Sequence, residues 1–385
     1  MTSPETRQIE FGSSRVDVLD FALDDGPLSD AYWKVLHAFL MDSYETCSTH
    51  RARIDRAGVK VDQLRSYDDF RRLPLLGPEE VRAIPPFQLL PDRYQAAAAS
   101  PRGFDGFPAR DRIAKIFQTS SSTGFPKTSV YTLDDWEAQQ SIIPRQHRHI
   151  PREKCSRIFN CFNPGHFGGK YIEDAFNRYG SVVVPRHFTH TSPAEIVAQL
   201  ARGIPGVGSF NALAGPPWTP GPSKGASVDD LLNADLDNVI GREIRLIRTS
   251  GAPTDLPELR LRERVWEAND LAGAPRTEFM ELYGCQEVGL PISECEKGEL
   301  HIHQGLVYVE IVDEKTGRHV GPEERGLVAF TGIRHGSRFI RYLIGDEATY
   351  LTAPCTCVRT SPRIRKIRRV TELERLRGGC AAGGF

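Results

Sequence analysis

The sequence predicts an α/β protein with largely parallel strands, followed by a small subdomain of antiparallel strands. Strand-like and helix-like segments alternate between residues 157 and 249, and this alternation is typical of a parallel sheet covered by helices. From residue 306 the pattern changes, because Val307, Val309 and Ile311 alternate with their neighbours ahead of a Gly-rich turn. That second pattern indicates an antiparallel hairpin.

The individual elements follow, in chain order, from periodicity and capping signals. Apolar positions at helical spacing predict a helix over 30–57, residues 73–81 predict a loop leading into a short helix, and Thr132 predicts the cap of a helix over 133–149. We then expect strands at 157–162, 181–185 and 244–249, helices at 169–179 and 194–202, and a strand at 326–332. The expected domains are an α/β core at 1–304, a small β subdomain at 305–367, and a hinge-like stretch with a flexible tail at 368–385.

The composition excludes several classes of protein. The 385 residues are 39% hydrophobic and 26% charged with a net charge of −1, which argues against a disordered chain and against nucleic-acid binding through a basic surface. The first residues contain no apolar segment, and no run of 18 apolar residues occurs. We therefore expect neither an export signal nor a membrane span, and a cytoplasmic protein with small-molecule partners.

A run of small hydroxylated residues closed by Gly, Pro and Lys is the first candidate site. It consists of Thr119, Ser120, Ser121, Ser122, Thr123, Gly124, Phe125, Pro126 and Lys127. Hydroxyls, accessible backbone N–H groups and one ammonium suit the oxygens of a nucleotide triphosphate. The spacing of a Walker loop is absent. A Ser-rich surface turn is the alternative interpretation.

This loop resembles the phosphate loop of the adenylate-forming enzymes, the acyl-CoA ligase and adenylation-domain superfamily, with Ser121 in place of one family glycine. Three later segments resemble other motifs of that superfamily: residues 248–253, the strand end that lines adenine; residues 281–287, the Y-G-x-T-E motif; and residues 341–346, the Y-R-x-G-D motif. The resemblance extends from about residue 73 to 379 and is nearest to the phenylacetate-CoA ligase branch.

The resemblance implies roles for particular residues. Lys127 and the hydroxyls of 119–123 would hold the phosphates of ATP, Glu287 would hold Mg²⁺, and Asp346 would accept both ribose hydroxyls. Tyr283 would pack on adenine, and the nucleotide-binding set would be completed by Gly251, Ala252, Gly284, Gln286 and Arg369. Gln286 replaces the usual Thr or Ser, although its amide can still donate a hydrogen bond.

The acyl-binding region and the chain end carry further expectations. The fold implied by the resemblance places the acyl or aryl group near Phe162, His166, Phe167, Gly168, Phe210 and Asn211. The aromatic residues and His166 favour an aromatic or medium-chain acid. Alternatively, His166 is a loop histidine whose hydrogen bonds are all made within the protein. Residues 368–379 resemble the hinge that precedes the family's mobile C-terminal domain. The chain ends at Phe385, and we expect that domain, with its adenylation lysine, to be absent.

Residues 368–370 and 379–381 also resemble the end of the luminescence acyl-protein synthetase, which accepts the acyl group on its own cysteine. Flanking glycines would let Cys380 move between the adenylate and an acceptor, and a thiolate can attack an acyl-adenylate. An incidental cysteine in a flexible tail is the alternative.

Four residues downstream of the core motifs match a structural zinc site. Cys295, His301, Cys355 and Cys357 supply three thiolates and one imidazole, a ligand set typical of closed Zn²⁺ sites. Some phenylacetate-CoA-ligase-like proteins carry such a site, so the resemblance implies one here. His303 is an alternative fourth ligand, and three buried cysteines beside a surface histidine are the alternative interpretation.

Together these features predict an ATP- and Mg²⁺-dependent enzyme that forms an acyl-adenylate and passes the acyl group to a thiol. Coenzyme A, a carrier protein, or Cys380 followed by a reductase are the possible acceptors, and an amine or nitrogen nucleophile is a further alternative. A nucleotide-binding protein that has lost catalysis is the rival from another class. We expect no nucleic-acid or membrane partner, and a homodimer remains open.

Overall fold

The computed structural model describes residues 8–11, 14–17, 28–119, 126–142, 146–147, 149–187, 192–218, 226–234, 239–254, 256–257, 259–357 and 359–370. The chain divides into two compact units. Unit 1 comprises Met1–Ser141, Cys285–Ile292 and His301–Ala381, and unit 2 comprises Ile142–Gly284 and Ser293–Leu300. Cys380 and the residues 120–125 of the predicted phosphate loop lie outside the described residues.

The elements before residue 142 are β1 (Gln8–Phe11), β2 (Ser14–Asp17), α2 (Asp30–Thr46), α3 (Ser48–Arg56), η1 (Val61–Gln63), α4 (Tyr67–Phe70), α5 (Pro78–Ala83), η2 (Pro86–Leu89), α6 (Asp92–Ala98), η3 (Ala109–Asp111), β3 (Ile113–Gln118), β4 (Thr128–Thr132) and α7 (Leu133–Ser141). Those that follow are η4 (Arg152–Cys155), β5 (Arg157–Asn160), α9 (Phe167–Tyr179), β6 (Val182–Pro185), α10 (Pro193–Arg202), β7 (Ala212–Gly215), α11 (Val228–Ala234), α12 (Val239–Glu243), β8 (Leu246–Ser250), α13 (Leu261–Leu271), β9 (Glu278–Cys285), β10 (Gly289–Glu294), β11 (Leu300–Ile302), β12 (Val307–Val312), β13 (Arg325–Gly332), β14 (Tyr342–Leu351) and β15 (Arg363–Arg369).

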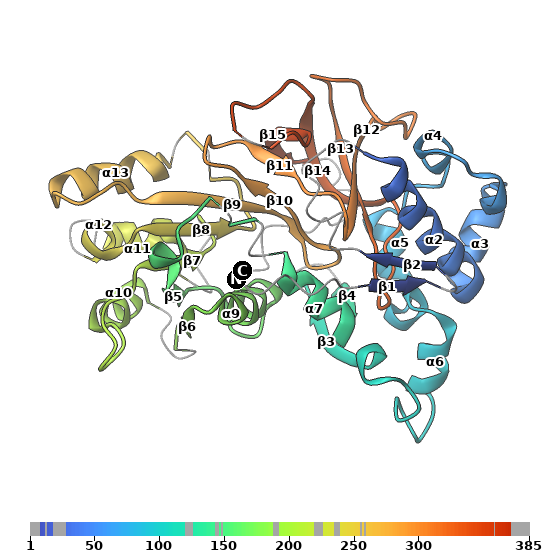
Figure 1. Cartoon of the computed structure of the whole chain (residues 1–385), viewed down its shortest axis with the longest axis horizontal. Coiled ribbons are helices and arrows are strands. Elements are labelled where there is room, and N and C mark those ends of the chain that lie inside the picture. The colour runs from blue at the N-terminus through green and yellow to red at the C-terminus, as the bar shows by residue number, and fades with distance from the viewer. Residues whose placement is uncertain are drawn as a thin grey trace. The chain divides into compact units, whose positions relative to one another are not determined.

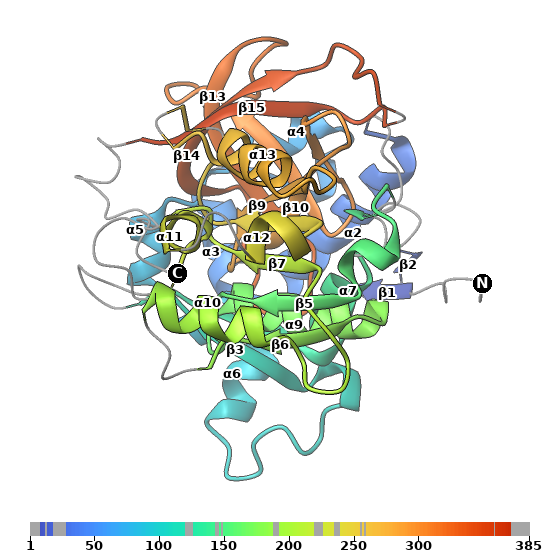
Figure 2. The same cartoon turned by 90° about the vertical axis from the view of Figure 1, so that its left-hand side faces the viewer.

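Unit 2 is built around parallel strands in the order β6-β5-β7-β8-β9. Helices α10 to α13 contribute to one apolar core with these strands, including Leu200, Val265 and the β8 residue Ile247; in Figure 2 the four helices lie in front of the strands. The next residue, Arg248, packs instead against the rings of α9. Because successive strand residues face opposite sides, α9 covers the other face. The predicted parallel α/β arrangement is confirmed.

Unit 1 contains the antiparallel strands β12 to β15, coloured orange to red in Figure 1. Each strand pairs with its neighbour in sequence, and β11 lies beside β15. The antiparallel hairpin expected after residue 306 is therefore confirmed as β12 and β13. The division of the chain at residues 304 and 367 stays a prediction.

The β3–β4 hairpin of unit 1 leads directly into α7, and the predicted cap is present. Asp135 donates its backbone N–H to the Thr132 hydroxyl at 3.2 Å, and Thr132 donates its N–H to the Asp135 carboxylate at 3.0 Å. Each residue thus satisfies a backbone donor of the other, which fixes where the helix begins.

The helix expected over residues 30–57 is divided into α2 and α3. Cys47 has extended dihedral angles at the break. The Asp92 carboxylate of α6 accepts hydrogen bonds from both the backbone N–H and the hydroxyl of Ser48, and a carboxylate at a helix start is favourable. A contact distant in sequence therefore starts a new helix where periodicity alone predicted continuation. Among the described residues, no helix is both long enough and apolar enough to cross a membrane.

Candidate functional site

The predicted phosphate loop joins β3 to β4, and its two ends are held together. Gln118 pairs with Thr128 in the ladder. One step further, Thr119 donates its N–H to the Lys127 carbonyl at 2.9 Å, while Lys127 donates its N–H to the Thr119 hydroxyl at 3.0 Å. Residues 119 and 127 therefore form the closed base of the loop.

Lys127 joins the loop to two other predicted motifs within unit 1. Its ammonium lies 2.7 Å from Glu287 Oε1 and 2.7 Å from the Tyr342 hydroxyl, which in turn donates to Glu287 Oε1 at 3.1 Å. The Lys127 and Glu287 side chains are only 2% and 0% exposed. We call these three residues the Lys–Glu–Tyr group. A buried ion pair needs such additional hydrogen bonds to offset its desolvation.

The Lys–Glu–Tyr group has the chemistry that the family roles require. An ammonium can donate to phosphate oxygens, and a carboxylate oxygen is the hard ligand that Mg²⁺ prefers. Glu287 therefore fits a magnesium ligand by its donor type, and Lys127 fits a phosphate ligand by its charge.

Gln286 supports the Lys–Glu–Tyr group through the backbone. Its side-chain amide donates to the Lys127 carbonyl at 3.3 Å, and its own carbonyl accepts from the Tyr131 hydroxyl at 2.5 Å. The Arg334 guanidinium lies 4.3 Å from the Tyr131 ring centroid, and burial raises the pKa of Tyr131 well above its ordinary value. The Gln that replaces the family's Thr or Ser thus has a structural use here: it ties the Y-G-x-T-E-like motif to the loop.

Asp346 and Arg369, two predicted nucleotide-binding residues, are paired across β14 and β15 in unit 1. Arg369 Nη1 lies 3.1 Å from the Asp346 carboxylate and donates to the Ile344 carbonyl at 2.7 Å. The intervening Gly345 has φ +91°, and a Cβ there would lie 2.9 Å from Arg369 Nη1. Glycine is therefore favoured at this position by its backbone conformation, and a larger residue would also displace the Arg369 guanidinium.

The predicted adenine-binding residues of unit 2 lie at the carboxyl ends of two neighbouring parallel strands, Gly251 and Ala252 just after β8, and Tyr283 and Gly284 near the end of β9. Ser250 of β8 pairs with Leu282 of β9, so Gly251–Ala252 and Tyr283–Gly284 extend from matched positions at the carboxyl edge of the sheet. Ligands of parallel α/β sheets bind at this edge. Gly251 has φ +93°, which permits the chain to turn there.

The predicted acyl-binding residues at the start of α9 include a helix cap. His166 is the N-cap of α9, and its Nδ1 accepts from the Gly168 N–H at 3.3 Å. This contact favours the interpretation of His166 as a loop histidine that hydrogen-bonds within the protein, which the sequence left open. Phe162 and Phe167 are buried, and a Cβ at Gly168 would lie 3.3 Å from the Phe162 ring. The role of these residues toward a substrate stays a prediction.

Phe210 and Asn211 have structural contacts within unit 2. The Phe210 ring packs against Phe159 at 5.1 Å in the core that α10 to α13 share. The Asn211 side chain accepts from the Arg157 N–H at 2.9 Å and donates to the Ser156 hydroxyl at 2.9 Å. These contacts account for the burial of both residues, and their predicted contact with an acyl group stays a prediction.

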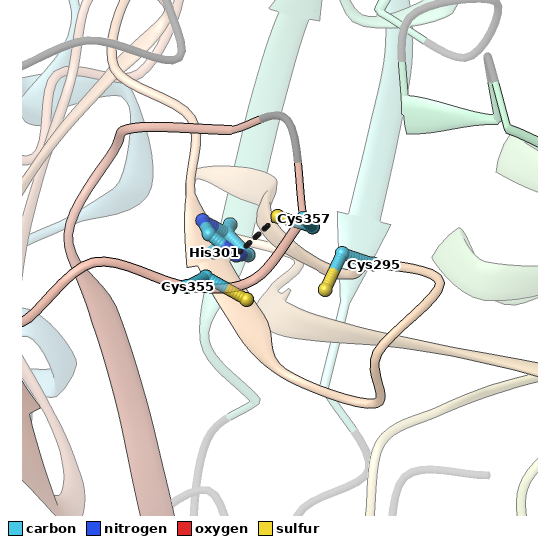
Figure 3. A group of neighbouring side chains, drawn as sticks. All are labelled: Cys295, His301, Cys355 and Cys357. Atoms are coloured by element: carbon cyan, nitrogen blue, oxygen red, sulfur yellow. Dashed lines mark hydrogen bonds between the residues drawn. The ribbon is translucent and has the colours of Figure 1, made fainter.

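The four predicted zinc ligands lie close together, as Figure 3 shows. Cys295, His301, Cys355 and Cys357 each offer one ligand atom, and all four atoms lie within 4.8 Å of one another. Zn–S bonds of about 2.3 Å in a tetrahedron place ligand atoms about 3.8 Å apart. The spacing is therefore close to that of a bound tetrahedral metal.

The surroundings of these side chains match a metal site as well. His301 Nε2 faces the Cys357 sulfur at 3.3 Å, while its Nδ1 lies 3.2 Å from the Ser361 carbonyl. Such a second contact orients a ligating imidazole. Burial, and then the nearby Arg359, lower the pKa of His301 to about 4, so the ring is neutral at pH 7. Backbone N–H groups donate to the sulfurs of Cys295 and Cys357, which suits thiolates.

Comparisons with known proteins agree with the motifs. No family model matches the chain. The phenylacetate-coenzyme A ligase of Thermus thermophilus is 25% identical over 84% of this chain and 66% of its own length, and that of Escherichia coli is 24% identical over 86% and 68%. The chain is similar to the phenylacetate-coenzyme A ligases, the branch of the adenylate-forming superfamily that its motifs resemble. It thus spans about two thirds of the length of these relatives.

The fold of this chain is also found in solved structures. An open conformation of 2-hydroxyisobutyryl-CoA ligase in complex with 2-HIB-AMP and CoA has a TM-score of 0.68 and 18% identity, covering 88% of this chain and 69% of that one. The same ligase in the thioesterification state has a TM-score of 0.68 and 19% identity, over 90% of this chain and 70% of that one. These likenesses confirm the predicted α/β fold.

Three buried residues of these sites received no individual role from the sequence. Tyr342 lies inside the Y-R-x-G-D-like motif, and its position in the same motif as Asp346 was a usable signal. Arg248 begins the segment that resembles the adenine-lining strand end, whereas Arg334 lies outside every predicted motif; both are buried cations. Only their packing against aromatic rings distinguishes them.

Proposed function

We propose that this protein activates a carboxylic acid with ATP and transfers the resulting acyl group to a thiol. The observation that carries the proposal is the Lys–Glu–Tyr group. It brings together the end of the phosphate loop, the Y-G-x-T-E-like motif and the Y-R-x-G-D-like motif through contacts of 2.7–3.1 Å. The phenylacetate-coenzyme A ligases that resemble most of the chain support the same reaction class.

In the first step, a carboxylate oxygen of the substrate attacks the α-phosphorus of ATP. A bond forms between that oxygen and phosphorus, and the bond to the bridging oxygen breaks, releasing pyrophosphate. Lys127 would donate to phosphate oxygens, and its charge would stabilise the negative charge that develops there. Glu287 would hold Mg²⁺, which would further neutralise the phosphate charge.

In the second step, a thiolate sulfur attacks the acyl carbon and AMP departs with the electrons of the broken C–O bond. Coenzyme A is the acceptor that the named relatives favour. The alternative acceptors are Cys380, a carrier protein and a nitrogen nucleophile. A further alternative is a protein that binds nucleotide but does not catalyse a reaction.

The test is pyrophosphate release from ATP and Mg²⁺ across a panel of aryl and aliphatic acids. We expect release that depends on the acid, and an acyl-CoA product once coenzyme A is added. A mass increase of the protein equal to the acyl group, lost in Cys380→Ser, would assign the acceptor to Cys380 instead. ATP binding without release from any acid would contradict the proposed activity.

We also propose that Cys295, His301, Cys355 and Cys357 hold one structural zinc ion. The four-ligand set leaves no open coordination position, which is the feature of structural rather than catalytic zinc. The ion would tie the β10–β11 segment to the loop before β15, and its binding free energy would add to folding stability.

Purified protein should contain about one zinc per chain, measured by inductively coupled plasma mass spectrometry. Cys355→Ser should lose most of the metal, because three ligands bind Zn²⁺ less tightly than four, and its melting temperature should fall. Cys47→Ser, at a cysteine remote from the cluster in sequence, is the matched control and should retain the metal. A wild-type protein without metal after purification free of chelators, and unable to take up added Zn²⁺, would exclude the site.

A further inference from the structure

Arg248, in the middle of β8, is a buried cation without a carboxylate partner among the described residues. Its residue exposure is 2%. Nε, Nη1 and Nη2 are all buried, and the groups that act on the guanidinium are the Tyr171 hydroxyl and the Cys155 thiol rather than an acid. Burying a charge without an opposite charge is strongly unfavourable. Such a side chain is therefore suited to meet a carboxylate that the described residues do not supply.

Aromatic rings pack against the planar face of the Arg248 guanidinium, so its edge does not take part in these contacts. The guanidinium carbon lies 5.5 Å from the Tyr171 ring centroid and 5.0 Å from that of Phe176, both on α9. Cation–π contacts of this kind engage the planar face. The five N–H donors point along the edge, in the fork that matches a carboxylate. Burial lowers the pKa of Arg248 to about 10, so the group is charged at pH 7.

Two other buried hydroxyls lie near Arg248. The Tyr171 hydroxyl is beside the guanidinium, which opposes the rise that burial causes in the pKa of Tyr171. The Ser181 hydroxyl is beside the Cys155 thiol. Cys155 is close enough to Arg248 that the cation opposes the rise of the Cys155 pKa. Buried polar groups without a negative charge thus gather around Arg248 in unit 2.

This cluster faces the same side of the sheet as α9, whose start carries the predicted acyl-binding residues His166, Phe167 and Gly168. Arg248 and Ser250 share one face of β8, since strand residues alternate, and the predicted residues 251 and 252 follow directly. On α9, Phe167 of the predicted acyl region stacks on Tyr171 one turn later, with centroids 5.6 Å apart. The two residue steps from Arg248 to Ser250 correspond to about 7 Å of strand.

We infer that the acid activated by this protein carries a second carboxylate at its far end, bound by Arg248. This inference rests on the proposed function and names its substrate class: dicarboxylic acids, with the two carboxylates separated by a benzene ring or by a chain of several carbons. An acid without the second group would leave the cation buried without an opposite charge, which selects against it.

The experiment compares matched acids: terephthalate with benzoate, and adipate with hexanoate. We expect kcat/KM for pyrophosphate release to be about 10–100-fold higher for each diacid, mostly through KM, because each buried charge-assisted pair contributes strongly. Arg248→Met should remove this preference, so that terephthalate and adipate are activated no better than benzoate and hexanoate. Arg248→Lys keeps the positive charge but lacks the paired N–H donors of a guanidinium, so it should retain part of the preference for diacids.

A binding measurement separates the inference from the proposed function. Terephthalate should raise the melting temperature of the wild-type protein more than benzoate does, and this difference should vanish in Arg248→Met. Arg276→Met, at an exposed arginine of unit 2, is the control and should leave both readouts unchanged. If Arg248→Met does not fold, Arg248→Lys and Tyr171→Phe carry the comparison.

Release from monoacids and diacids at equal efficiency, with no diacid-specific rise in melting temperature, would overturn the inference and leave acid activation intact; ordered water would then be the partner of Arg248. Absence of release from every acid, with the diacid-specific rise present, would overturn the proposed function and support the binding site.

Discussion

Replacing Lys127 by methionine should lower acid-dependent pyrophosphate release by about 10²–10³-fold, the usual cost of losing one well-placed donor to developing charge. The ammonium lies at the base of the phosphate loop and 2.7 Å from Glu287. Methionine keeps much of the side-chain volume and removes the charge. Stopped assays with saturating ATP, Mg²⁺ and the best acid of the panel measure the loss.

Two controls distinguish chemistry from folding in this prediction. Lys115→Met changes a lysine of the same hairpin that packs over Trp136, and it should keep the wild-type rate within a few-fold. Glu287→Gln should show a loss comparable to that of Lys127→Met, with a higher Mg²⁺ requirement, because the amide is a weaker metal ligand. Thermal unfolding of each variant checks that the fold persists. Near-wild-type rates in both Lys127→Met and Glu287→Gln would contradict the assigned roles.

Replacing Arg341 by methionine should reduce the free energy of unfolding by about 3–5 kcal/mol, the range observed when one partner of a buried ion pair is removed. Arg341 makes a two-pronged pair with Glu310, with both N–O distances 3.1 Å. Its remaining donors reach the carbonyls of Arg71, Leu73 and Gly317 at 2.5–2.6 Å. All five guanidinium N–H groups therefore have acceptors, and the substitution leaves a buried carboxylate and three carbonyls without them.

Urea unfolding followed by circular dichroism measures this effect. Arg365→Met is the matched control, since Arg365 pairs with Glu323 where both side chains are more than half exposed. It should cost no more than about 1 kcal/mol. Combining Arg341→Met with Glu310→Leu should recover part of the lost stability, because no unpaired buried charge then remains. An Arg341→Met protein as stable as Arg365→Met would show that the network contributes little.

The stability prediction bears on activity because Arg341 precedes Tyr342. The Arg341 carbonyl accepts from the Leu76 N–H at 3.0 Å, and Arg341 has φ +51°, a conformation uncommon for a residue with a Cβ. The network that holds this turn therefore also sets where the Tyr342 hydroxyl meets Lys127. Partial loss of pyrophosphate release in a folded Arg341→Lys protein is the expected functional consequence.

Local features of the sequence determined the type of most elements. The alternation of segments between 157 and 249 predicted the parallel strands, and the cap of α7 was readable because Thr132 and Asp135 lie within one turn. Four motifs in family order, together with Cys295, His301, Cys355 and Cys357, predicted the nucleotide and metal sites. These signals are legible because capping, periodicity and motif spacing depend on residues near one another in the chain.

Tertiary structure decided which of these residues meet. Lys127 and Tyr342 are 215 residues apart, and only the packing of unit 1 brings them together at Glu287. The break between α2 and α3 depends on Asp92, and the surroundings of Arg248 depend on which helix covers its face of β8. Such relations follow from strand pairing and side-chain packing between distant segments. Hydrophobicity and local propensity do not encode them, so the sequence by itself determined the elements and motifs, and the fold alone determined their contacts.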